Sequence, residues 1–108
     1  MHQTDTEWST TEQKVAQVAF DKAYKREISA LIHEVRESSS AIAALEDIWR
    51  LHDYLSAKRH NIDGKYDYQY SVLVFVFARL IKEGWLQLDE LEGLDKGKLA
   101  KIASLARM

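Results

Sequence analysis

Residues 9–40 read STTEQKVAQVAFDKAYKREISALIHEVRESSS, and this stretch decides the fold class. Ser9 is followed three residues later by Glu12, a capping-box pattern that favours the start of a helix. Apolar residues then recur in steps of three and four as far as the serines at 38–40, which is typical of one amphipathic helix. These apolar positions are Ala16, Phe20, Tyr24, Ile28, Leu31 and Val35. Such a helix is about 40 Å long, so its apolar face is too long for a small domain to cover alone.

The serines at 38–40 can cap a second helix, whose apolar face repeats in steps of three, four and seven. Its members are Ala44, Ile48, Leu51, Leu55 and Ile62. We expect this helix to end at residues 61–64, with Gly64 in a left-handed C-terminal position. Two such helices joined by a short loop form a hairpin, and two hairpins from two chains can bury their apolar faces together. The pattern predicts a homodimer with an interface formed by Ile28, Leu31, Ile32, Val35, Ile48 and Leu51.

The run VLVFVFARLIKEG at residues 72–84 suits a buried strand or a buried helix by composition alone. A helix is favoured because the run is long for a strand, no partner strand is evident, and Gly84 follows as a helix stop. A short helix is expected to start at residues 89–92, and Asp95 is expected to cap the last helix. The inner face of that last helix is formed by Leu99, Ile102 and Leu105.

The composition favours a single helical domain. The 108 residues allow one modest core, and the chain has no proline and only 4 glycines, so helix breakers are few. We therefore expect an all-α fold: a long antiparallel helical hairpin plus a compact C-terminal helical head, dimerising through the long helices. The expected parts are a flexible N-terminus at residues 1–8, the hairpin at 9–64 and the head at 65–108.

Charge and cysteine content exclude several classes of protein. Lys and Arg number 15 against 17 Asp and Glu, so there is no broad basic field for nucleic acid. The absence of cysteine excludes disulfides, thiolate zinc sites and a cysteine nucleophile. The N-terminus lacks the pattern of a secretory leader, and no apolar run approaches the roughly 20 residues of a transmembrane helix. We expect a cytoplasmic protein without a transmembrane segment.

A mixed group of aromatic, charged and polar side chains lies beside the apolar face of the second predicted helix. Its members are Trp49, His52, Asp53, Ser56, Arg59 and His60. His52 and His60 are about 12 Å apart along a helix, so they cannot ligate one metal ion at about 2 Å. Motifs for nucleophilic, phosphate-binding or paired-carboxylate chemistry are missing, so we expect neither an enzyme nor a cofactor. Tryptophan and arginine with a polar rim are typical of a protein-binding hot spot.

A structural interpretation of the same residues stays open on pattern alone. Trp49 could pack against the C-terminal helices, His52 could be a satisfied interior histidine, and the charged residues could be solvated. Phe75 and Phe77 face nearly opposite ways on a helix, so one of them is expected to be more exposed. The aromatic loop at 66–70 is either a helix-joining turn or an extension of the binding surface.

Several nearly contiguous blocks of the sequence carry a resemblance to a known family. They are WRLHD (49–53), LSAKRH (55–60), IDGKYDY (62–68), SVL (71–73), FVFA (75–78) and KEGWL (82–86). A looser match lies in the first predicted helix, at FDKAY (20–24) with Arg26 and Glu27. Through these blocks the chain resembles the fluorescence recovery protein family of cyanobacteria, from around Trp8 to the C-terminus.

The resemblance implies an all-helical, non-enzymatic regulator of photoprotection that dimerises through its long helices. Such a protein binds the photoactivated red form of the orange carotenoid protein, chiefly through that protein's C-terminal domain, and speeds its return to the inactive orange form. The return ends quenching of phycobilisome excitation and restores fluorescence. The residues implied in partner binding are Trp49, His52, Asp53 and Arg59, with Phe75 and Lys101 in the head. Peripheral contact with the cytoplasmic side of the thylakoid membrane is left open.

Within this interpretation, we expect Asp53 to orient either Arg59 or a cation of the partner. Two positions depart from the family blocks: Tyr54 stands where phenylalanine is common, and Asn61 where glutamate is expected. Asn61 lowers the negative charge near the surface and could alter partner preference. The alternative is a helical homodimeric protein-binding or assembly factor with an unknown partner, which would bind without changing that partner's kinetics.

Overall fold

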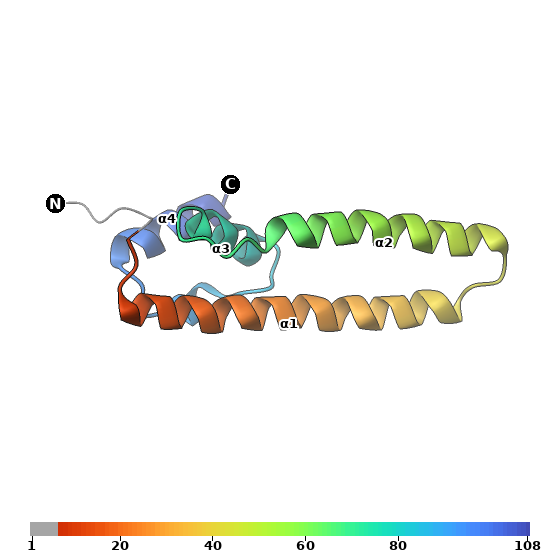
Figure 1. Cartoon of the computed structure of the whole chain (residues 1–108), viewed down its shortest axis with the longest axis horizontal. Coiled ribbons are helices and arrows are strands. Elements are labelled where there is room, and N and C mark those ends of the chain that lie inside the picture. The colour runs from red at the N-terminus through yellow and green to blue at the C-terminus, as the bar shows by residue number, and fades with distance from the viewer. Residues whose placement is uncertain (1–6) are drawn as a thin grey trace.

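The computed structural model describes residues 7–108 as an elongated all-α molecule of 62 × 23 × 17 Å. Two long antiparallel helices, α1 (Thr10–Ser40) and α2 (Leu45–Lys65), form a hairpin, and the shorter elements gather at the end where α1 begins (Figure 1). These elements are α3 (Leu73–Lys82), the 3₁₀ helix η1 (Leu88–Leu91) and α4 (Lys96–Ala106). The predicted all-α fold class is confirmed. Of the N-terminus expected to be flexible, residues 1–6 lie outside the described residues.

The start of α1 is a capping box, as predicted. The Glu12 N–H donates to Ser9 Oγ at 3.1 Å, and the Ser9 N–H donates back to Glu12 Oε1 at 3.0 Å. The end of α1 differs from the prediction, because the helix continues through the serines and ends at Ser40. These serines therefore do not cap α2. Asp47 does so instead, since its Oδ2 accepts the N–H groups of Ala43 and Ala44, and these bonds lower the pKa of Asp47.

The end of α2 also differs from the prediction. Gly64 lies inside the helix, which continues to Lys65, and Gly64 is not among the described glycines with positive φ. The left-handed position expected for it is therefore wrong, and Tyr66 ends the helix with a φ of −87°. The stop predicted after the third helix is confirmed, since Gly84 has a φ of 87° and its N–H donates to the carbonyl of Ile81.

The hydrophobic core lies in the head and under the first half of α1. Its largest fully buried apolar side chains are Phe77, Leu73, Leu80, Leu86, Leu91, Ile102 and Val74. Ala16, Ala19 and Ala23 are also buried, and their small side chains let the head approach the backbone of α1 closely. Trp8, the last residue of the N-terminus expected to be flexible, is only 8% exposed and packs against Tyr70 with ring centroids 5.6 Å apart. The packed structure therefore begins before the first helix.

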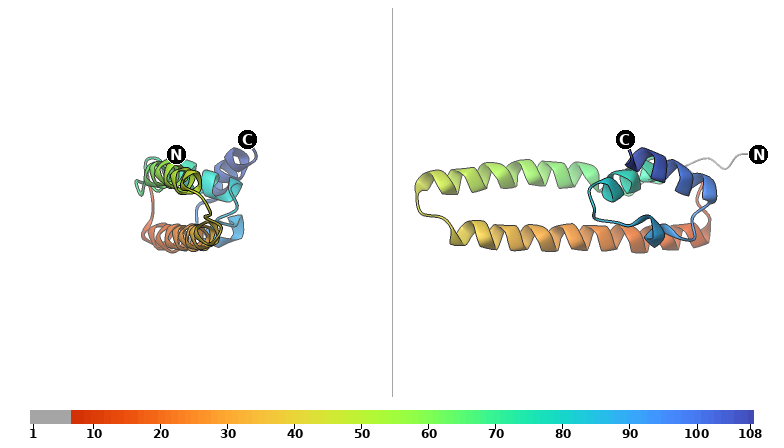
Figure 2. Two further views of the ribbon diagram at one scale, coloured as in Figure 1. Left: turned by 90° about the vertical axis from the view of Figure 1, so that its right-hand side faces the viewer. Right: turned by 180° about the vertical axis from the view of Figure 1, so that it is seen from behind.

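The hairpin beyond the head is thin, and we call residues 28–61 the arm. Every residue from Ile28 to Asn61 is at least partly exposed. The end-on view in Figure 2 shows α3, η1 and α4 on one side of the plane that contains α1 and α2. The head therefore leaves the other side of the hairpin uncovered.

Candidate protein-binding site

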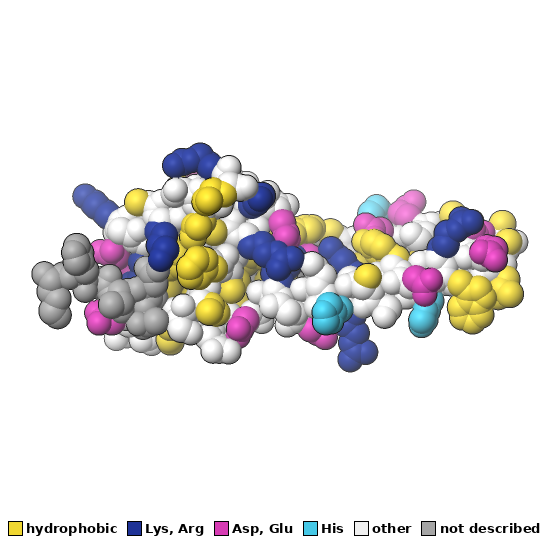
Figure 3. Space-filling model, turned by 90° about the horizontal axis from the view of Figure 1, so that it is seen from above, with side chains coloured by type: hydrophobic (Ala, Val, Ile, Leu, Met, Phe, Trp, Pro, Cys, Tyr) yellow, Lys and Arg dark blue, Asp and Glu magenta, His cyan; other side chains and the backbone are white. Residues whose placement is uncertain are grey.

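The arm carries the mixed group of side chains on the surface of α2. Trp49 is 53% exposed, and its ring meets His52 edge-on with centroids 6.3 Å apart. The interpretation in which Trp49 packs against the C-terminal helices is therefore wrong, as is the one in which His52 is an interior histidine. Both side chains are exposed because no element of the described part of the chain lies beside α2 on this side. Figure 3 views the molecule from the α2 side, where histidine, acidic and basic side chains alternate with exposed apolar groups along the narrow arm.

The charged members of this group have partners that differ from those expected. His52 Nδ1 lies 3.2 Å from Asp53 Oδ1, and both side chains are well exposed. Arg59 Nε lies 3.7 Å from Asp63 Oδ2, one helical turn further on. The expectation that Asp53 orients Arg59 is therefore wrong within a single chain, because Asp63 occupies that role. Asp53 remains available to a cation of a partner.

A shallow hollow of about 300 Å³ lies within the same surface, lined by His52, Leu55, Ser56 and Arg59. Its lining provides an aliphatic floor with an imidazole, a hydroxyl and a guanidinium around it. Trp49 lies one helical turn before His52. The group therefore offers an aromatic anchor with a polar rim, which is the composition of a protein-binding hot spot. Residues 7–108 hold no group of three or more His, Asp or Glu side chains that could bind a metal ion.

The head residues lie apart from the arm group, on α3 and α4. Phe75 is 51% exposed whereas Phe77 is fully buried, so the prediction that one of the two is exposed is confirmed. Lys101 Nζ lies over the Phe75 ring, 5.1 Å from its centroid. A hollow of about 550 Å³ beside Phe75 is lined in part by Arg79, Lys82 and Leu105. Sequence reasoning did not place Arg79 and Lys82 beside Phe75, and Glu83, which lines the same hollow, is paired with Arg79.

The residues expected at a dimer interface share one side of the hairpin. In α1 they lie about 120° around the helix from the alanines that face the head. In α2, Ile48 lies about 80–100° around the helix from Lys58 and Lys65, whose ammonium groups bind Glu27 of α1, whereas Leu51 lies only about 20–40° from them and borders the side that faces α1. Because the helices are antiparallel, both stripes face the same way, on the side that the head leaves uncovered. Ile32 and Ile48 are 47% and 44% exposed, and the others are half-buried: Ile28, Leu31, Val35 and Leu51.

The aromatic loop at 66–70 packs as a helix-joining turn. The ring of Phe20 meets those of Tyr66 and Tyr68 edge-on, with centroids 5.5 and 4.9 Å away. The Tyr66 hydroxyl donates to Glu27 Oε1 at 2.7 Å. Burial and this hydrogen bond raise the pKa of Tyr66, and burial together with a hydrogen bond to Tyr70 raises that of Tyr68 to about 12. Both hydroxyls are therefore protonated at neutral pH.

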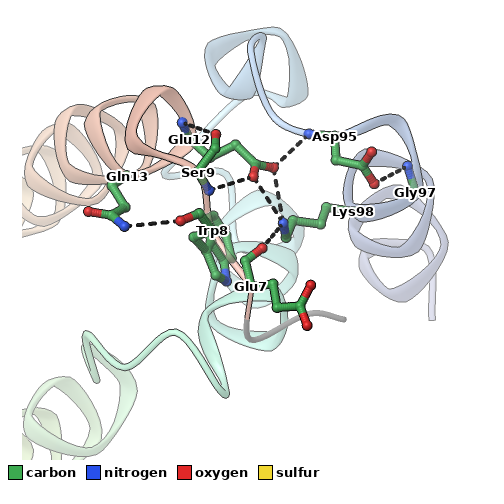
Figure 4. A network of polar contacts seen from close by, with 8 residues as sticks. All are labelled: Glu7, Trp8, Ser9, Glu12, Gln13, Asp95, Gly97 and Lys98. Atoms are coloured by element: carbon green, nitrogen blue, oxygen red, sulfur yellow. Dashed lines mark hydrogen bonds and ion pairs between the residues drawn. The ribbon is translucent and has the colours of Figure 1, made fainter. Parts of the chain in front are cut away.

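Two buried ion pairs were missed from the sequence. Lys98 Nζ binds the Glu12 carboxylate and the carbonyl of Glu7, while the Asp95 N–H donates to the same carboxylate (Figure 4). The second pair joins Lys65 to Glu27. Burial acts to raise the pKa of Glu27, but hydrogen bonds from Lys65, Tyr66 and Lys58 outweigh it and hold that pKa below its usual value.

A signal for these pairs was present in the first helix. Glu12 and Glu27 stand four residues outside Ala16 and Ala23, so they continue the small-residue face that packs on the head. A carboxylate at such a position has to be buried with a cation. The sequence could therefore have shown that each glutamate has a basic partner, although not which residue it is.

Comparisons with known proteins identify one family. The model of the family described as photoprotection regulator fluorescence recovery protein matches residues 8–106. The chain belongs to the fluorescence recovery protein family. It is 50% identical over 101 residues to the fluorescence recovery protein of Synechocystis sp., a match that covers 94% of this chain and 93% of that protein. The family description names a regulator of photoprotection and not an enzyme.

Solved structures of the fluorescence recovery protein family have the same fold. The Fremyella diplosiphon protein is 70% identical with a TM-score of 0.92, and the match covers 94% of this chain and 100% of that one. The Synechocystis structure is 50% identical with a TM-score of 0.91 and the same coverage. Within residues 7–108, no helix has the length and apolar character needed to cross a membrane.

Proposed function

We propose that this chain binds the photoactivated red form of the orange carotenoid protein, chiefly its C-terminal domain, and accelerates its return to the inactive orange form. The return ends non-photochemical quenching at the phycobilisome and restores fluorescence. Membership of a family of photoprotection regulators supports the proposal. The observation that carries it is the exposed Trp49 among His52, Asp53 and Arg59, on a helix face that nothing in residues 7–108 covers. We place this activity in the cytoplasm, with peripheral contact at the thylakoid surface.

The mechanism is differential binding. A protein speeds a conformational return only if it binds the barrier state, or the arrangement that leads to it, more tightly than the starting form. Equal affinity for every state would change no rate or population. We infer that the chain holds the separated domains of the partner in a productive relative placement.

Each group of residues has a part in this binding. Trp49 is the apolar anchor, Arg59 and His52 are hydrogen-bond donors, and Asp53 accepts from a cationic group of the partner. Phe75 with Lys101 forms a second contact, on the head. Aromatic and charged side chains that are exposed in the free chain become desolvated on binding, and this makes them strong contributors to affinity.

The arm also supports a homodimer. A hairpin whose apolar face is exposed from Ile28 to Leu51 gains stability when a second copy covers that face. The proposed interface consists of Ile28, Leu31, Ile32, Val35, Ile48 and Leu51. This face and the outer surface of α2 with Trp49 point in different directions, so a dimer leaves Trp49 accessible.

The test is the dark decay of red to orange absorbance of photoactivated orange carotenoid protein, with a substoichiometric amount of this chain. We expect acceleration with several turnovers per molecule. Trp49→Ala should remove most of the acceleration, while Val18→Ala, which shortens another exposed apolar side chain, should leave it unchanged. A decay that this chain does not change would contradict the proposal. Binding without any kinetic effect would favour the alternative, an assembly factor.

A further inference from the structure

Charged groups from α1, α2 and the end of α3 meet a tyrosine hydroxyl of the loop where the arm joins the head. We call them the junction cluster, and its members are Glu27, Lys58, Lys65, Tyr66, Arg79 and Glu83. At its centre, Lys65 Nζ lies 2.7 Å from Glu27 Oε1 and 2.7 Å from Glu83 Oε1. Arg79 Nε holds the other oxygen of Glu83 at 3.0 Å. The cluster therefore links α1, the end of α2 and the end of α3.

The central pair is removed from water. The side chains of Glu27 and Lys65 are each 1% exposed, and every buried polar side-chain atom in the described chain has a hydrogen-bond partner. A buried ion pair adds little net stability over an apolar pair of the same size. It does restrict geometry, because the carboxylate is satisfied only where Lys65, Lys58 and the Tyr66 hydroxyl converge. The cluster is therefore better suited to fix a placement than to stabilise the fold.

The cluster lies where the arm leaves the head, so the geometry it restricts is the direction of the arm. Glu27 is the last buried residue of α1 before the arm, and Lys65 is the last residue of α2. Trp49 lies about 24 Å from Lys65 along the axis of α2, so a tilt of about 5° at the junction moves Trp49 by about 2 Å. Binding surfaces need much finer placement than this.

We propose that the junction cluster is a positioning joint, which sets the angle between arm and head so that the Trp49 and Phe75 surfaces meet one partner molecule together. The inference rests on the proposed function, because it assumes a partner that spans both surfaces. Two linked surfaces reinforce one another only when their spacing matches that of the sites they bind. Loosening the joint therefore leaves each surface able to bind, but it lowers the affinity gained when both surfaces bind the same partner molecule.

The variants distinguish the loss of the joint from a general loss of folding stability. Glu27→Met combined with Lys65→Met removes both central charges, so neither is left buried without a partner. Glu83→Gln is the milder variant, because Glu83 is partly exposed and Lys65 keeps Glu27. The control is Glu90→Gln, which breaks an ion pair of 2.7 Å between Arg26 of α1 and η1 and leaves every member of the junction cluster in place. Circular dichroism verifies that each variant is folded.

The first measurement is a distance between arm and head. The chain has no cysteine, so Ala57→Cys on α2 and Ala100→Cys on α4 give two unique spin-label positions. Pulsed electron paramagnetic resonance, with labelled chains diluted in unlabelled ones, should show a narrow distance distribution in the parent and in Glu90→Gln. The double variant should give a distribution at least twice as wide, and Glu83→Gln an intermediate one. Equally wide distance distributions in the parent and all variants would contradict the proposal that the cluster fixes the arm. If the double variant does not fold, the width measured for Glu83→Gln decides.

The second measurement is a concentration series of the recovery assay. Loosening the joint should raise the half-saturating concentration at least tenfold, while the rate at saturation stays within twofold. An unchanged half-saturating concentration together with a widened distance distribution would refute the role of the joint in binding. If the parent chain does not accelerate recovery, the proposed function has failed, whereas the distance measurement still decides whether the cluster fixes the arm.

Discussion

Lys98 Nζ lies 3.0 Å from Glu12 Oε2, although 86 positions of sequence separate the two residues. Both side chains are almost fully buried, and the ammonium group also stands over the Trp8 ring, 4.7 Å from its centroid. The contact joins α4 and the N-terminal segment to the first turn of α1. The capping box and the attachment of the last helix therefore share one carboxylate.

Lys98→Met should lower the free energy of unfolding by about 3 kcal/mol, because it leaves the Glu12 carboxylate buried without its cation. Urea unfolding followed by circular dichroism measures the loss. Lys96→Met, an exposed neighbour in the same helix, should change that free energy by less than about 0.5 kcal/mol. Equal midpoints for the two variants would show that the ion pair is not needed.

Trp49→Ala should separate stability from function. Since Trp49 is 53% exposed, the free energy of unfolding should change by less than about 1 kcal/mol. The acceleration of recovery should fall at least tenfold, because loss of a central aromatic anchor costs about 2 kcal/mol or more of binding. The absorbance decay and urea unfolding measure the two effects. Full acceleration by this variant would exclude Trp49 from the binding site.

Ile32→Glu should convert the proposed dimer into monomers, because it places a charge on the apolar face of the hairpin. Light scattering coupled to size exclusion gives the mass in solution. The matched control is His33→Glu, which introduces the same charge on the neighbouring, outward-facing position of α1 and should keep the dimeric mass. A dimeric mass for Ile32→Glu would place the interface elsewhere.

Two glycines should respond to alanine in opposite directions. Gly93 has a φ of 112°, and a Cβ there would lie 2.8 Å from Val15 Cγ2, so Gly93→Ala should destabilise the fold by about 2 kcal/mol. Gly64 lies inside α2 with open space around it, so Gly64→Ala should stabilise the fold by about 0.5–1 kcal/mol. Thermal and urea unfolding measure both changes. Stabilisation of the fold by Gly93→Ala would contradict the close packing of its turn on α1.

The Arg26–Glu90 pair should make part of the stability dependent on pH. Hydrogen bonds from the Arg26 guanidinium and from the Gln87 N–H lower the pKa of Glu90 to about 2 in the folded chain. A lowered folded-state pKa favours folding above the ordinary carboxyl pKa, and that contribution disappears as the pH falls from about 4.5 to about 2. Arg26→Gln should therefore be less stable than the parent at pH 7, and the difference between their urea midpoints should shrink towards pH 2. A difference that is constant with pH would show that Arg26 acts through packing instead.

The fold class could be predicted because the period of α1 persists for its whole length and no proline interrupts the chain. Helix ends were less predictable, because they depend on competition between local signals and tertiary contacts. The serines at 38–40 look like a cap, yet Asp47 supplies the cap of α2 from inside that helix. Gly64 looks like a stop, yet the helix continues until Lys65 reaches its partners on α1 and α3.

The candidate site could be listed from the sequence, but its exposure could not. Whether Trp49 is packed or exposed depends on which element lies beside α2, and local spacing carries no information on that. The pairing of Arg59 was misjudged for a simpler reason: Asp63 stands four residues after it, at the spacing where charged side chains meet on a helix. The buried pairs of Glu27 and Glu12 needed the three-dimensional arrangement, because their partners lie in distant segments.

The partly exposed arm has a consequence for how the protein responds to its own concentration. Outside the head, α1 and α2 of a lone chain are stabilised mainly by intrinsic helix propensity, which holds isolated helices only marginally. Their backbone amides should exchange with solvent deuterium far faster than those of the core, and should become protected only when another molecule covers the arm. If the proposed homodimer forms through the arm, we therefore expect the arm to be ordered in the dimer and to lose that order when dilution separates the chains.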